Sequence, residues 1–461
     1  MRIIVNSKIT IEDCPTPLLR KLNKALSFDN PEYEKKQRMG LWCGNTPKKL
    51  SMVERHGKNV IVPYGILKQL RQMPECKDAE ISHKKRSLEC SFEYGSCFKP
   101  YAYQEKAIQA AQEAGQGVII APCGSGKTNI GLELCARLGY TALWLTHTGD
   151  LLEQSINRAK SLFDMPESAY GTITAGKVNL GSIITFATVQ TMSKIDLSSI
   201  KDCFGVVICD ECHRIAGTPT KISMFYKVLS SLNAPYKYGL TATPYRSDGL
   251  IGCMFCLLGD VCCTIDKSET VSTTCEIFYH TKSLPFNADI DDITQVDGTL
   301  SWSKLVNALC ADEARTREIV HDVEKCMKAN KACLLLTDRV EHAKKIAKML
   351  GNNAVALVGS VSKAKRAHIL NELNTGVIKC VCATYQLAKE GLDVPNLEYV
   401  FFATPQKNPS TVEQSAGRVG RAAEGKKCGF IIDYVDSFGM LIHWHKLRKR
   451  VYKRIGAKEK T

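Results

Sequence analysis

One short segment constrains this chain of 461 residues more than any other. The apolar run Val118–Ala121 is followed by the glycine-rich loop Pro122–Gly126, and a helical pattern then extends from Thr128 to Leu138. A strand, a tight loop and a helix in this order gather backbone N–H groups and the positive end of the helix dipole around one point. The sequence therefore predicts a polyphosphate-binding loop.

Each residue type in this loop has a chemical role. Gly124 and Gly126 allow backbone N–H groups to point inward at the phosphates. Lys127 is expected to reach the β and γ phosphates, and the Thr128 hydroxyl to coordinate Mg²⁺. Ala121 stands where the usual pattern has its first glycine, which is a small departure. The predicted loop consists of Pro122, Cys123, Gly124, Ser125, Gly126, Lys127 and Thr128.

Apolar runs that alternate with helical patterns organise most of the remaining chain. The alternation begins near residue 98, is interrupted by an acidic stretch at 287–297, and then resumes. Such alternation predicts parallel sheets that helices cover on both faces. We therefore predict an α/β fold with two tandem parallel-sheet lobes at 98–285 and 286–435. A small α+β domain at 1–97 precedes them, and a basic helix at 436–461 follows.

The charge balance and the cysteine content of the chain bear on its partner, its compartment and a possible zinc site. Lys and Arg outnumber Asp and Glu by 62 to 47, a net charge of +15, which favours a polyanionic partner, although solubility alone would also explain it. The 21 cysteines are odd in number and scattered, which fits a reducing compartment. Cys253 and Cys256 suggest zinc only weakly, because no matching second pair follows; they fit the apolar side of a short buried helix better.

Neither a membrane span nor a signal peptide is predicted. No apolar run approaches the roughly 18 residues that a span requires, and the first residues turn polar too soon for a signal peptide. We therefore expect a cytoplasmic protein, in the host cytoplasm if it is encoded by a phage, with no membrane partner.

An acidic pair follows another buried strand. Asp210 and Glu211 come directly after the apolar run 204–209. At the carboxyl end of a strand near a phosphate loop, Asp210 can hold Mg²⁺ and Glu211 can orient and deprotonate the attacking water. The next strand ends in Thr241 and Thr243, which we expect to hydrogen-bond the acidic pair and to pass a signal onward.

A third cluster of polar residues lies far along the chain. Gln414, Arg418 and Arg421 are spaced i, i+4, i+7 and would share one face of a helix. Gly417 and Gly420 are poor helix formers, so a close backbone approach is expected to require them. Two guanidiniums at a lobe boundary suit the charge that spreads over a γ-phosphate in the transition state. A solvated basic helix face is the alternative.

In this order the motifs resemble those of the superfamily two helicases and translocases. The resemblance covers residues 98–435 and implies two RecA-like lobes, ATP and Mg²⁺ as cofactors, and DNA as partner. It implies that Gln104 reads the adenine with Phe98 as a stacking partner, that Gly391 and Asp393 belong to the nucleotide motif, and that His213 joins Thr241 and Thr243 in coupling. Nucleic-acid contacts are implied for Thr146, His147, Gln154, Thr188, Gln190, Arg246, Thr337, Arg339, Gly359 and Thr384.

Other segments narrow the resemblance. Arg246, Ser247 and Asp248 are similar to a motif of the XPB-like DNA helicases, with Ser where Glu is usual. Segments 30–33 and 62–65 resemble the leading domain of phage branch-migration helicases of the UvsW kind. That likeness implies that the leading domain reads DNA junctions.

Two basic segments are candidates for contact with a duplex or a fork. One is the cluster Lys84, Lys85 and Arg86, and the other is the terminal helix. Trp444 and Tyr452 of that helix could stack on a base. Packing of Trp444 as a core anchor is an equally good reading.

We therefore expect a monomeric, ATP-driven DNA helicase that acts on forked or branched DNA, in branch migration, fork regression, recombination, replication or repair. Lys127, Glu211, Gln414, Arg418 and Arg421 are its expected catalytic residues. A duplex translocase that does not separate strands remains an alternative, as does a nucleotide-switched DNA-binding protein. An RNA helicase fits less well.

Overall fold

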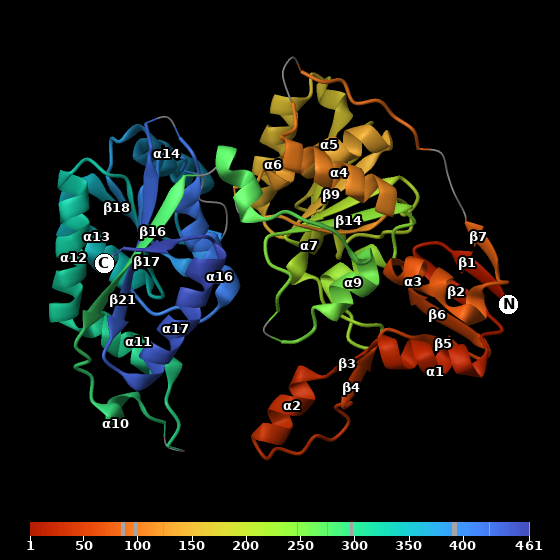
Figure 1. The fold of residues 1–461 in the computed structure, drawn as a ribbon, viewed down its shortest axis with the longest axis horizontal. Helices are drawn as coiled ribbons and strands as arrows, with labels where there is room; N and C mark the ends of the chain where they lie inside the picture. Colours follow the sequence, from red (N-terminus) through yellow and green to blue (C-terminus); the bar gives the residue numbers. More distant parts are fainter. Residues whose placement is uncertain are drawn as a thin grey trace. The chain divides into compact units, whose positions relative to one another are not determined.

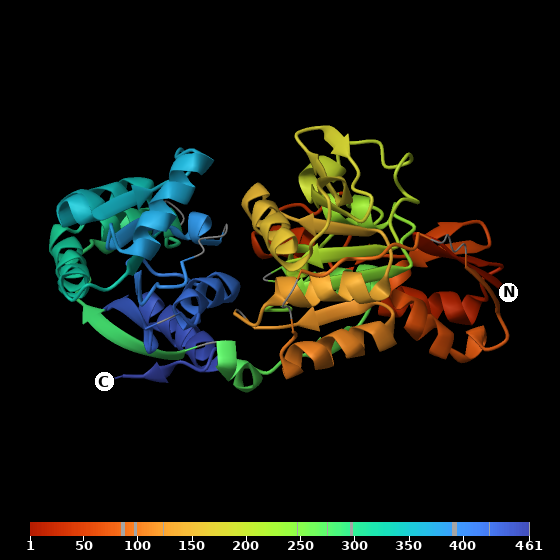
Figure 2. The same cartoon turned by 90° about the horizontal axis from the view of Figure 1, so that it is seen from above.

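A computed structural model describes residues 1–83, 88–95, 99–122, 124–246, 248–273, 275–295, 298–389, 394–423 and 425–460. The chain divides into two compact units (Figures 1 and 2). The first contains Met1–Pro122 and Gly126–Asp266, and the second begins at Lys267. Each unit is described by itself below.

The N-terminal part of the first unit is a small α+β domain with a mixed sheet. Its strands have the order β5-β6-β2-β1-β7, and alternate residues of β1, β2 and β6 are buried, as a sheet with one covered face requires. The elements are β1 (Arg2–Val5), β2 (Lys8–Glu12), α1 (Thr16–Ala25), β5 (Glu54–His56), β6 (Asn59–Pro63), α3 (Leu67–Gln72) and β7 (Glu80–His83).

A two-stranded antiparallel ribbon follows α1 in the chain, and a helix connects its two strands. The ribbon pairs β3 (Ser27–Asp29) with β4 (Lys49–Ser51), and α2 (Pro31–Arg38) lies between them. Asn30 closes its base, because its buried side chain accepts from Glu32 N and donates to Pro47 O. Figure 1 shows these residues, 27–51, extending away from the five-stranded sheet; we call them the α2 arm.

The N-terminal domain is joined to the rest of the first unit by a shared hydrophobic core. One cluster of buried side chains runs from Ile3 and Val62 of the domain to Cys253 and Leu257 of α9 (Gly252–Leu258). Polar contacts reinforce this seam, since the Tyr64 hydroxyl donates to Pro235 O at 2.6 Å. The sequence predicted the buried helix that holds Cys253 and Cys256, and the structure confirms it.

The remainder of the first unit is a predominantly parallel eight-stranded sheet with the order β11-β10-β12-β9-β13-β14-β8-β15. Helices α4, α5 and α6 cover one face, and α7 and α9 cover the other (Figure 1). The strands are β8 (Gly117–Ile120), β9 (Ala142–Thr146), β10 (Tyr170–Thr174), β11 (Lys177–Asn179), β12 (Ile184–Thr188), β13 (Val206–Asp210), β14 (Tyr236–Thr241) and β15 (Val261–Thr264). The helices are α4 (Ala102–Ala114), α5 (Lys127–Leu138), α6 (Gly149–Leu162), α7 (Val189–Met192) and α8 (Met224–Leu229).

The second unit contains a parallel sheet of seven strands with the order β18-β19-β17-β20-β21-β16-β22. Its strands are β16 (Glu276–Leu284), β17 (Cys333–Thr337), β18 (Ala354–Leu357), β19 (Cys380–Thr384), β20 (Tyr399–Phe402), β21 (Cys428–Asp436) and β22 (Lys458–Glu459). Helices cover both faces: α10 (Ile290–Ile293), α11 (Trp302–Ala311), α12 (Glu313–Lys328), α13 (Val340–Leu350), α14 (Lys363–Thr375), α15 (Tyr385–Lys389), α16 (Pro409–Ala416) and α17 (Gly439–Arg454).

The boundary between the lobes differs from the predicted 285/286. Strand β16 pairs in parallel with β21 along nine residues, so the second unit begins before it, at Lys267. The acidic stretch after residue 286 had suggested a linker. It follows the first strand of the second sheet instead and includes the short helix α10.

The C-terminal helix is part of the second unit. Arg448 of α17 is buried and forms a bidentate ion pair with Asp433, at 2.8 Å for both contacts. Tyr452 is fully buried and donates to Asp433, so its predicted stacking on a base is wrong. Trp444 is partly buried and packs edge-on against Trp302, as the alternative reading expected.

In the described part of the chain, no helix has the length and apolar character that a membrane crossing requires.

Candidate functional site

Three neighbouring strands of the first sheet bring the predicted catalytic segments together. Strands β13, β14 and β8 are adjacent and parallel, so the segments that follow them meet at one edge. These segments are the phosphate loop, the acidic pair Asp210–Glu211, and the Thr241–Thr243 turn. The sheet topology therefore assembles one site from residues more than 100 positions apart.

The loop has the backbone conformation that phosphate binding requires. Gly124 and Gly126 adopt φ angles of +86° and +75°, which L-residues rarely adopt, and α5 begins at Lys127. Lys127 Nζ donates to Ala121 O at 3.3 Å. A Cβ on Gly126 would lie 2.6 Å from Gln104 Nε2, so the amide of Gln104 borders the loop.

Gln104 is held in place by the start of α4. Its side chain is 1% exposed, and Gln104 Oε1 accepts from Tyr101 N at 3.0 Å. The predicted adenine-reading residue is therefore beside the loop and oriented by a capping interaction.

The two acidic residues have opposite pKa shifts. Burial at the end of β13, with the adjacent Glu211 carboxylate, raises the pKa of Asp210 to about 7, although the charge of Lys127 opposes this. Burial alone would also raise the pKa of Glu211. The nearby His213 ring and the charges of Lys127, His213 and Arg214 lower it to about 2. The pair therefore favours an ionised Glu211, the form that accepts a proton.

His213 connects Glu211 to the next strand. Its Nδ1 lies 3.2 Å from Glu211 Oε2 and 3.0 Å from Thr241 Oγ1. Thr241 Oγ1 also donates to Thr243 O at 3.1 Å. The predicted contact between the threonines and the acidic pair is thus indirect, and His213 forms the link.

The donor set fits a magnesium nucleotide. Asp210 supplies a buried carboxylate, Thr128 a hydroxyl at the start of α5, and the loop a row of backbone N–H groups. Carboxylate and hydroxyl oxygens are the ligands that Mg²⁺ prefers. Glu211 follows Asp210 directly in the chain, and its action on a water molecule stays a prediction.

Four predicted nucleic-acid contacts of the first unit lie at the ends of strands β9 and β12 or just after them: Thr146, His147, Thr188 and Gln190. Gln190 Nε2 donates to His147 O at 2.6 Å, so the segments that follow the two strands are joined. Thr188 caps α7, Thr146 is buried, and its hydroxyl donates to Thr148 O. Gln154 is exposed on α6.

Arg246 has partners other than a nucleic acid. It forms two hydrogen bonds to Asp248, at 3.0 and 2.6 Å, and Nη1 donates to His213 O at 3.1 Å. The structure thus places this predicted DNA contact against the turn that carries His213.

In the second unit, the predicted nucleic-acid contacts lie at the ends of strands β17 and β19 or follow strands β17 and β18. Arg339 Nε donates to Asn307 Oδ1 at 2.7 Å and lines a pocket of about 420 Å³. Thr337 is buried and contacts His342, whereas Gly359 is exposed. Thr384 ends β19 and is partly buried. Parallel strands place all four positions at one edge of the sheet.

The segment with Gln414, Arg418 and Arg421 is not one helix. Helix α16 ends at Ala416, and the 3-10 turn Gly417–Gly420 follows, so the predicted common α-helical face is wrong. The close approach predicted for Gly420 is confirmed, because a Cβ there would lie 2.7 Å from Ile277 Cδ1. Arg418 is 9% exposed and Arg421 is partly buried. Their action on a γ-phosphate stays a prediction.

Several predicted site residues lie outside the described residues. They are Phe98, Cys123, Gly391, Asp393, Lys84, Lys85 and Arg86.

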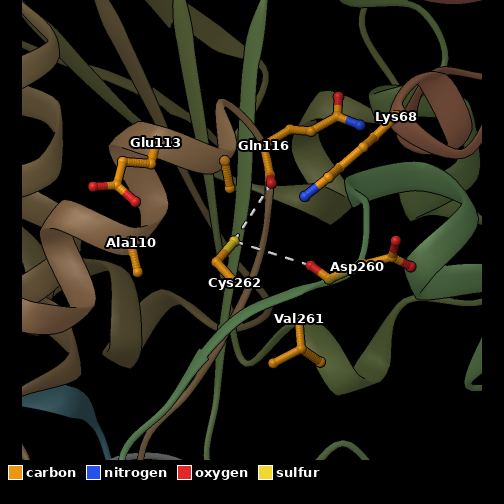
Figure 3. Close-up of a pocket in the computed structure, with 8 residues that line it drawn as sticks. Lys68, Ala110, Glu113, Gln116, Asp260, Val261 and Cys262 are labelled. Atoms are coloured by element: carbon orange, nitrogen blue, oxygen red, sulfur yellow. Dashed lines mark hydrogen bonds between the residues drawn. The ribbon is translucent and has the colours of Figure 1, made fainter. Parts of the chain in front are cut away.

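A separate pocket of about 350 Å³ lies at the opposite end of β8, near Gln116. Figure 3 shows Lys68 of the N-terminal domain pointing toward Cys262, whose thiol donates to the backbone oxygen of Gln116 at 3.4 Å. The side-chain amide of Gln116 points away from Cys262 and donates to Gly65 O at 2.9 Å. Because β8 runs from this pocket toward the phosphate loop, the pocket is distinct from the nucleotide site. It marks the seam between the N-terminal domain and the sheet.

Sequence reasoning missed two residues that the structure makes prominent. Trp42 of the α2 arm is 86% exposed, the largest exposed fraction among the large apolar side chains of the described chain. A tryptophan between a basic segment and a Gly-Asn-Thr-Pro turn was a visible signal. The sequence indicated Asp248 only as part of a motif. Its two hydrogen bonds with Arg246 could not be predicted from the spacing of the two residues.

Two domain families match the chain. Residues 97–246 match the family described as "Type III restriction enzyme, res subunit", and residues 315–423 match the "Helicase conserved C-terminal domain". The two matches contain the phosphate loop, the acidic pair and the arginine segment.

Curated relatives and solved structures agree with these families. A putative ATP-dependent RNA helicase of Acanthamoeba polyphaga mimivirus is 26% identical over 72% of this chain, and the match spans 62% of that protein. The DNA 3'-5' translocase XPB2 of Sulfurisphaera tokodaii is 31% identical over 32% of this chain and 31% of its own. The Hef helicase domain of Pyrococcus furiosus has a similar fold, with a TM-score of 0.51 and 17% identity over 76% of this chain and 98% of that domain.

Proposed function

Because the chain belongs to the superfamily two helicases, we propose that it is a motor that hydrolyses ATP with Mg²⁺ and moves along DNA. One observation carries this proposal: a single sheet edge holds a phosphate loop, an acidic pair of which Asp210 is buried and Glu211 partly buried, and a histidine that contacts both Glu211 and Thr241. A loop that served only as a nucleotide-dependent switch would not need an ionised carboxylate positioned for water.

The residues divide the work of hydrolysis. Lys127 and the N–H groups of the loop hold the phosphates, and Gln104 contacts the base. Glu211 orients the attacking water and accepts its proton. Asp210 and Thr128 would hold Mg²⁺, which would supply positive charge to the phosphoryl group of bound ATP. Arg418 and Arg421 are proposed to stabilise that charge from the second unit.

Two observations support DNA as the nucleic acid along which the proposed motor moves. The net charge of +15 favours phosphate contacts that depend on salt and not on sequence, which is the grip that a motor needs on any sequence. The Sulfurisphaera relative, moreover, is named a DNA translocase. Segments 146–148 and 188–190 supply the proposed grip in the first unit.

The α2 arm supports a preference for forked or branched DNA. Between residues 30 and 49 the arm carries five basic and two acidic side chains. Exposed Met39, Leu41 and Trp42 follow α2. Unpaired bases at a junction offer faces on which an exposed indole can stack, and neighbouring phosphates offer counter-charges. The proposed work is therefore fork regression or branch migration.

The test is a set of ATPase and strand-displacement assays on single-stranded, duplex, forked and four-way DNA. Forked or four-way DNA is expected to give the greatest stimulation. Trp42→Ala is expected to weaken fork binding by roughly 5- to 150-fold, because one base stack contributes about 1–3 kcal/mol. Val178→Ala, at another exposed apolar side chain of the first unit, serves as the matched control. Equal stimulation by all four DNAs would contradict the junction preference.

An RNA helicase is the second candidate, since the mimivirus relative is named as one. Duplex RNA that stimulates ATPase more than forked DNA would favour it. ATPase on plain duplex without strand displacement would instead indicate a translocase.

A further inference from the structure

Three hydrogen bonds from its guanidinium hold Arg246 to other parts of the first unit. Its guanidinium forms a fork with Asp248, with Nε to Oδ1 at 3.0 Å and Nη2 to Oδ2 at 2.6 Å. Asp248 is itself fixed, because Oδ1 accepts from Leu250 N at 3.1 Å. The third bond runs from Arg246 Nη1 to His213 O at 3.1 Å. The side chain is 19% exposed.

The carbonyl that Arg246 holds belongs to a strained part of the site. Glu211 has φ +51° and ψ +46°, in the left-handed region, and the 3-10 turn Cys212–Arg214 follows it directly. A non-glycine residue in this region costs about 1–2 kcal/mol and persists only where its surroundings hold it. Within the turn, Arg214 N donates to Glu211 O and Ile215 N donates to Cys212 O. The carbonyl of His213, by contrast, accepts its hydrogen bond from outside the turn, from Arg246.

The position of this turn decides whether His213 reaches its partners. His213 Nδ1 lies 3.2 Å from Glu211 Oε2 and 3.0 Å from Thr241 Oγ1. The contact with Thr241 has ordinary hydrogen-bond length, whereas the contact with Glu211 is an ion-pair contact at the long end of the usual range. A shift of the turn by about 1 Å would therefore break the contact with Glu211. Misplacement of that size reduces the rate of an enzyme by roughly 100-fold.

We propose that Arg246, anchored by Asp248, is a positioning residue for ATP hydrolysis: it fixes the 3-10 turn so that His213 holds Glu211 toward the attacking water. This role replaces the DNA contact that the sequence predicted for Arg246, and it rests on the proposed hydrolysis of ATP by Glu211.

The kinetic test compares Arg246→Ala, Arg246→Lys and Asp248→Asn with the wild type. Arg246→Ala is expected to lower kcat by roughly 10- to 100-fold with and without DNA, while KM for ATP changes less than about twofold. Arg246→Lys should recover part of the loss, because an ammonium can still donate to the His213 carbonyl. Asp248→Asn should give a smaller loss in the same direction. Lys331→Ala removes an ion pair of the second unit with Glu398 and serves as the matched control.

DNA binding distinguishes positioning from phosphate contact. Under the proposal, the DNA Kd of Arg246→Ala and its dependence on salt equal those of the wild type. Weaker binding, with a salt slope reduced by about one and an unchanged kcat without DNA, would assign Arg246 to a phosphate and overturn the proposal.

Hydrogen exchange of the full chain without nucleotide tests the positioning role of Arg246 independently of the proposed ATP hydrolysis. Arg246→Ala and Arg246→Lys should both speed amide exchange in residues 210–216 and leave the peptides of the second unit unchanged. Unchanged exchange in 210–216 overturns the positioning role whether or not the wild type hydrolyses ATP. A wild type without ATPase on any nucleic acid would instead refute the proposed function alone.

Discussion

Lys237 is a buried lysine at the seam of the first unit. It lies on β14 and is fully buried, and its ammonium donates to Leu229 O at 2.9 Å and Ser7 O at 3.4 Å. The ammonium also lies 4.9 Å from the centre of the Tyr64 ring. Among the described residues no carboxylate lies within ion-pair distance of it. Burial therefore lowers the pKa of Lys237 from 10.5 to about 7, with a small opposing effect of Cys209.

The sign of the pH effect follows from these two pKa values. The folded chain releases the proton of Lys237 near pH 7 and the unfolded chain near pH 10.5. Between these values the unfolded chain binds more protons, so the free energy of unfolding rises with pH. For a single site this amounts to about 2.5 kcal/mol between pH 6 and pH 9. A change of that size moves the melting temperature of a unit of this length by roughly 5–10 °C.

We expect Lys237→Met to remove this pH dependence. Below pH 7 the variant should unfold at a higher temperature than the wild type, although the Leu229 and Ser7 carbonyls lose their donor at a cost of about 1–3 kcal/mol. Toward pH 9 the order should reverse or the difference should vanish. Thermal unfolding of the full chain at pH 6, 7, 8 and 9 measures this, and Lys24→Met, at an exposed lysine of α1, is the control. Parallel curves for wild type and Lys237→Met across this range would refute the reasoning.

Three further substitutions test the site and the second unit. Lys127→Ala is expected to lower DNA-stimulated ATPase by about 100-fold or more in a coupled assay, because the phosphates lose a charged donor; full activity would show that the nucleotide site is misassigned. Arg421→Ala should leave the Kd of an ATP analogue nearly unchanged while turnover falls by about 10³-fold, whereas a loss of binding alone would indicate a ground-state role. Gly420→Ala places a Cβ 2.7 Å from Ile277 and should lower the stability of the second unit by about 1–3 kcal/mol in thermal unfolding. Gly439→Ala, where a Cβ meets nothing within 4 Å, is its control, and equal melting temperatures for the two variants would contradict the predicted contact.

The parts of the fold that the sequence predicts are those fixed by local patterns. Buried parallel strands such as β13 and β17 are apolar up to a polar last residue, and these apolar runs predict both the strands and the edge at which motifs meet. Strand β16 was not predicted, because the polar run from His280 to Ser283 interrupts its apolar residues. Its place in the sheet depends on pairing with β21, about 150 residues away.

The site shows the same division between local and distant determinants. The glycines of the phosphate loop and the acidic pair are contiguous motifs, and the sequence predicted their roles. The link through His213 could not be predicted, since a single ring nitrogen serves partners on two strands. Nor could the pairing of Arg246, because the carbonyl that it holds lies 33 residues earlier.

The arrangement of this edge suggests how DNA would stimulate hydrolysis. Strand β9 lies directly beside β13, so the segment after β9 borders the turn that follows Glu211. Burial lowers the pKa of His147 in that segment, and the positive charges of Arg214 and His213 lower it further, which places the imidazole near that turn. Gln190 ties the same segment to the one after β12. A DNA phosphate held by these two segments would bring negative charge close to the turn and steady it. Because the turn orients Glu211 and does not bind the phosphates of ATP, such stimulation should raise kcat and leave KM for ATP nearly constant.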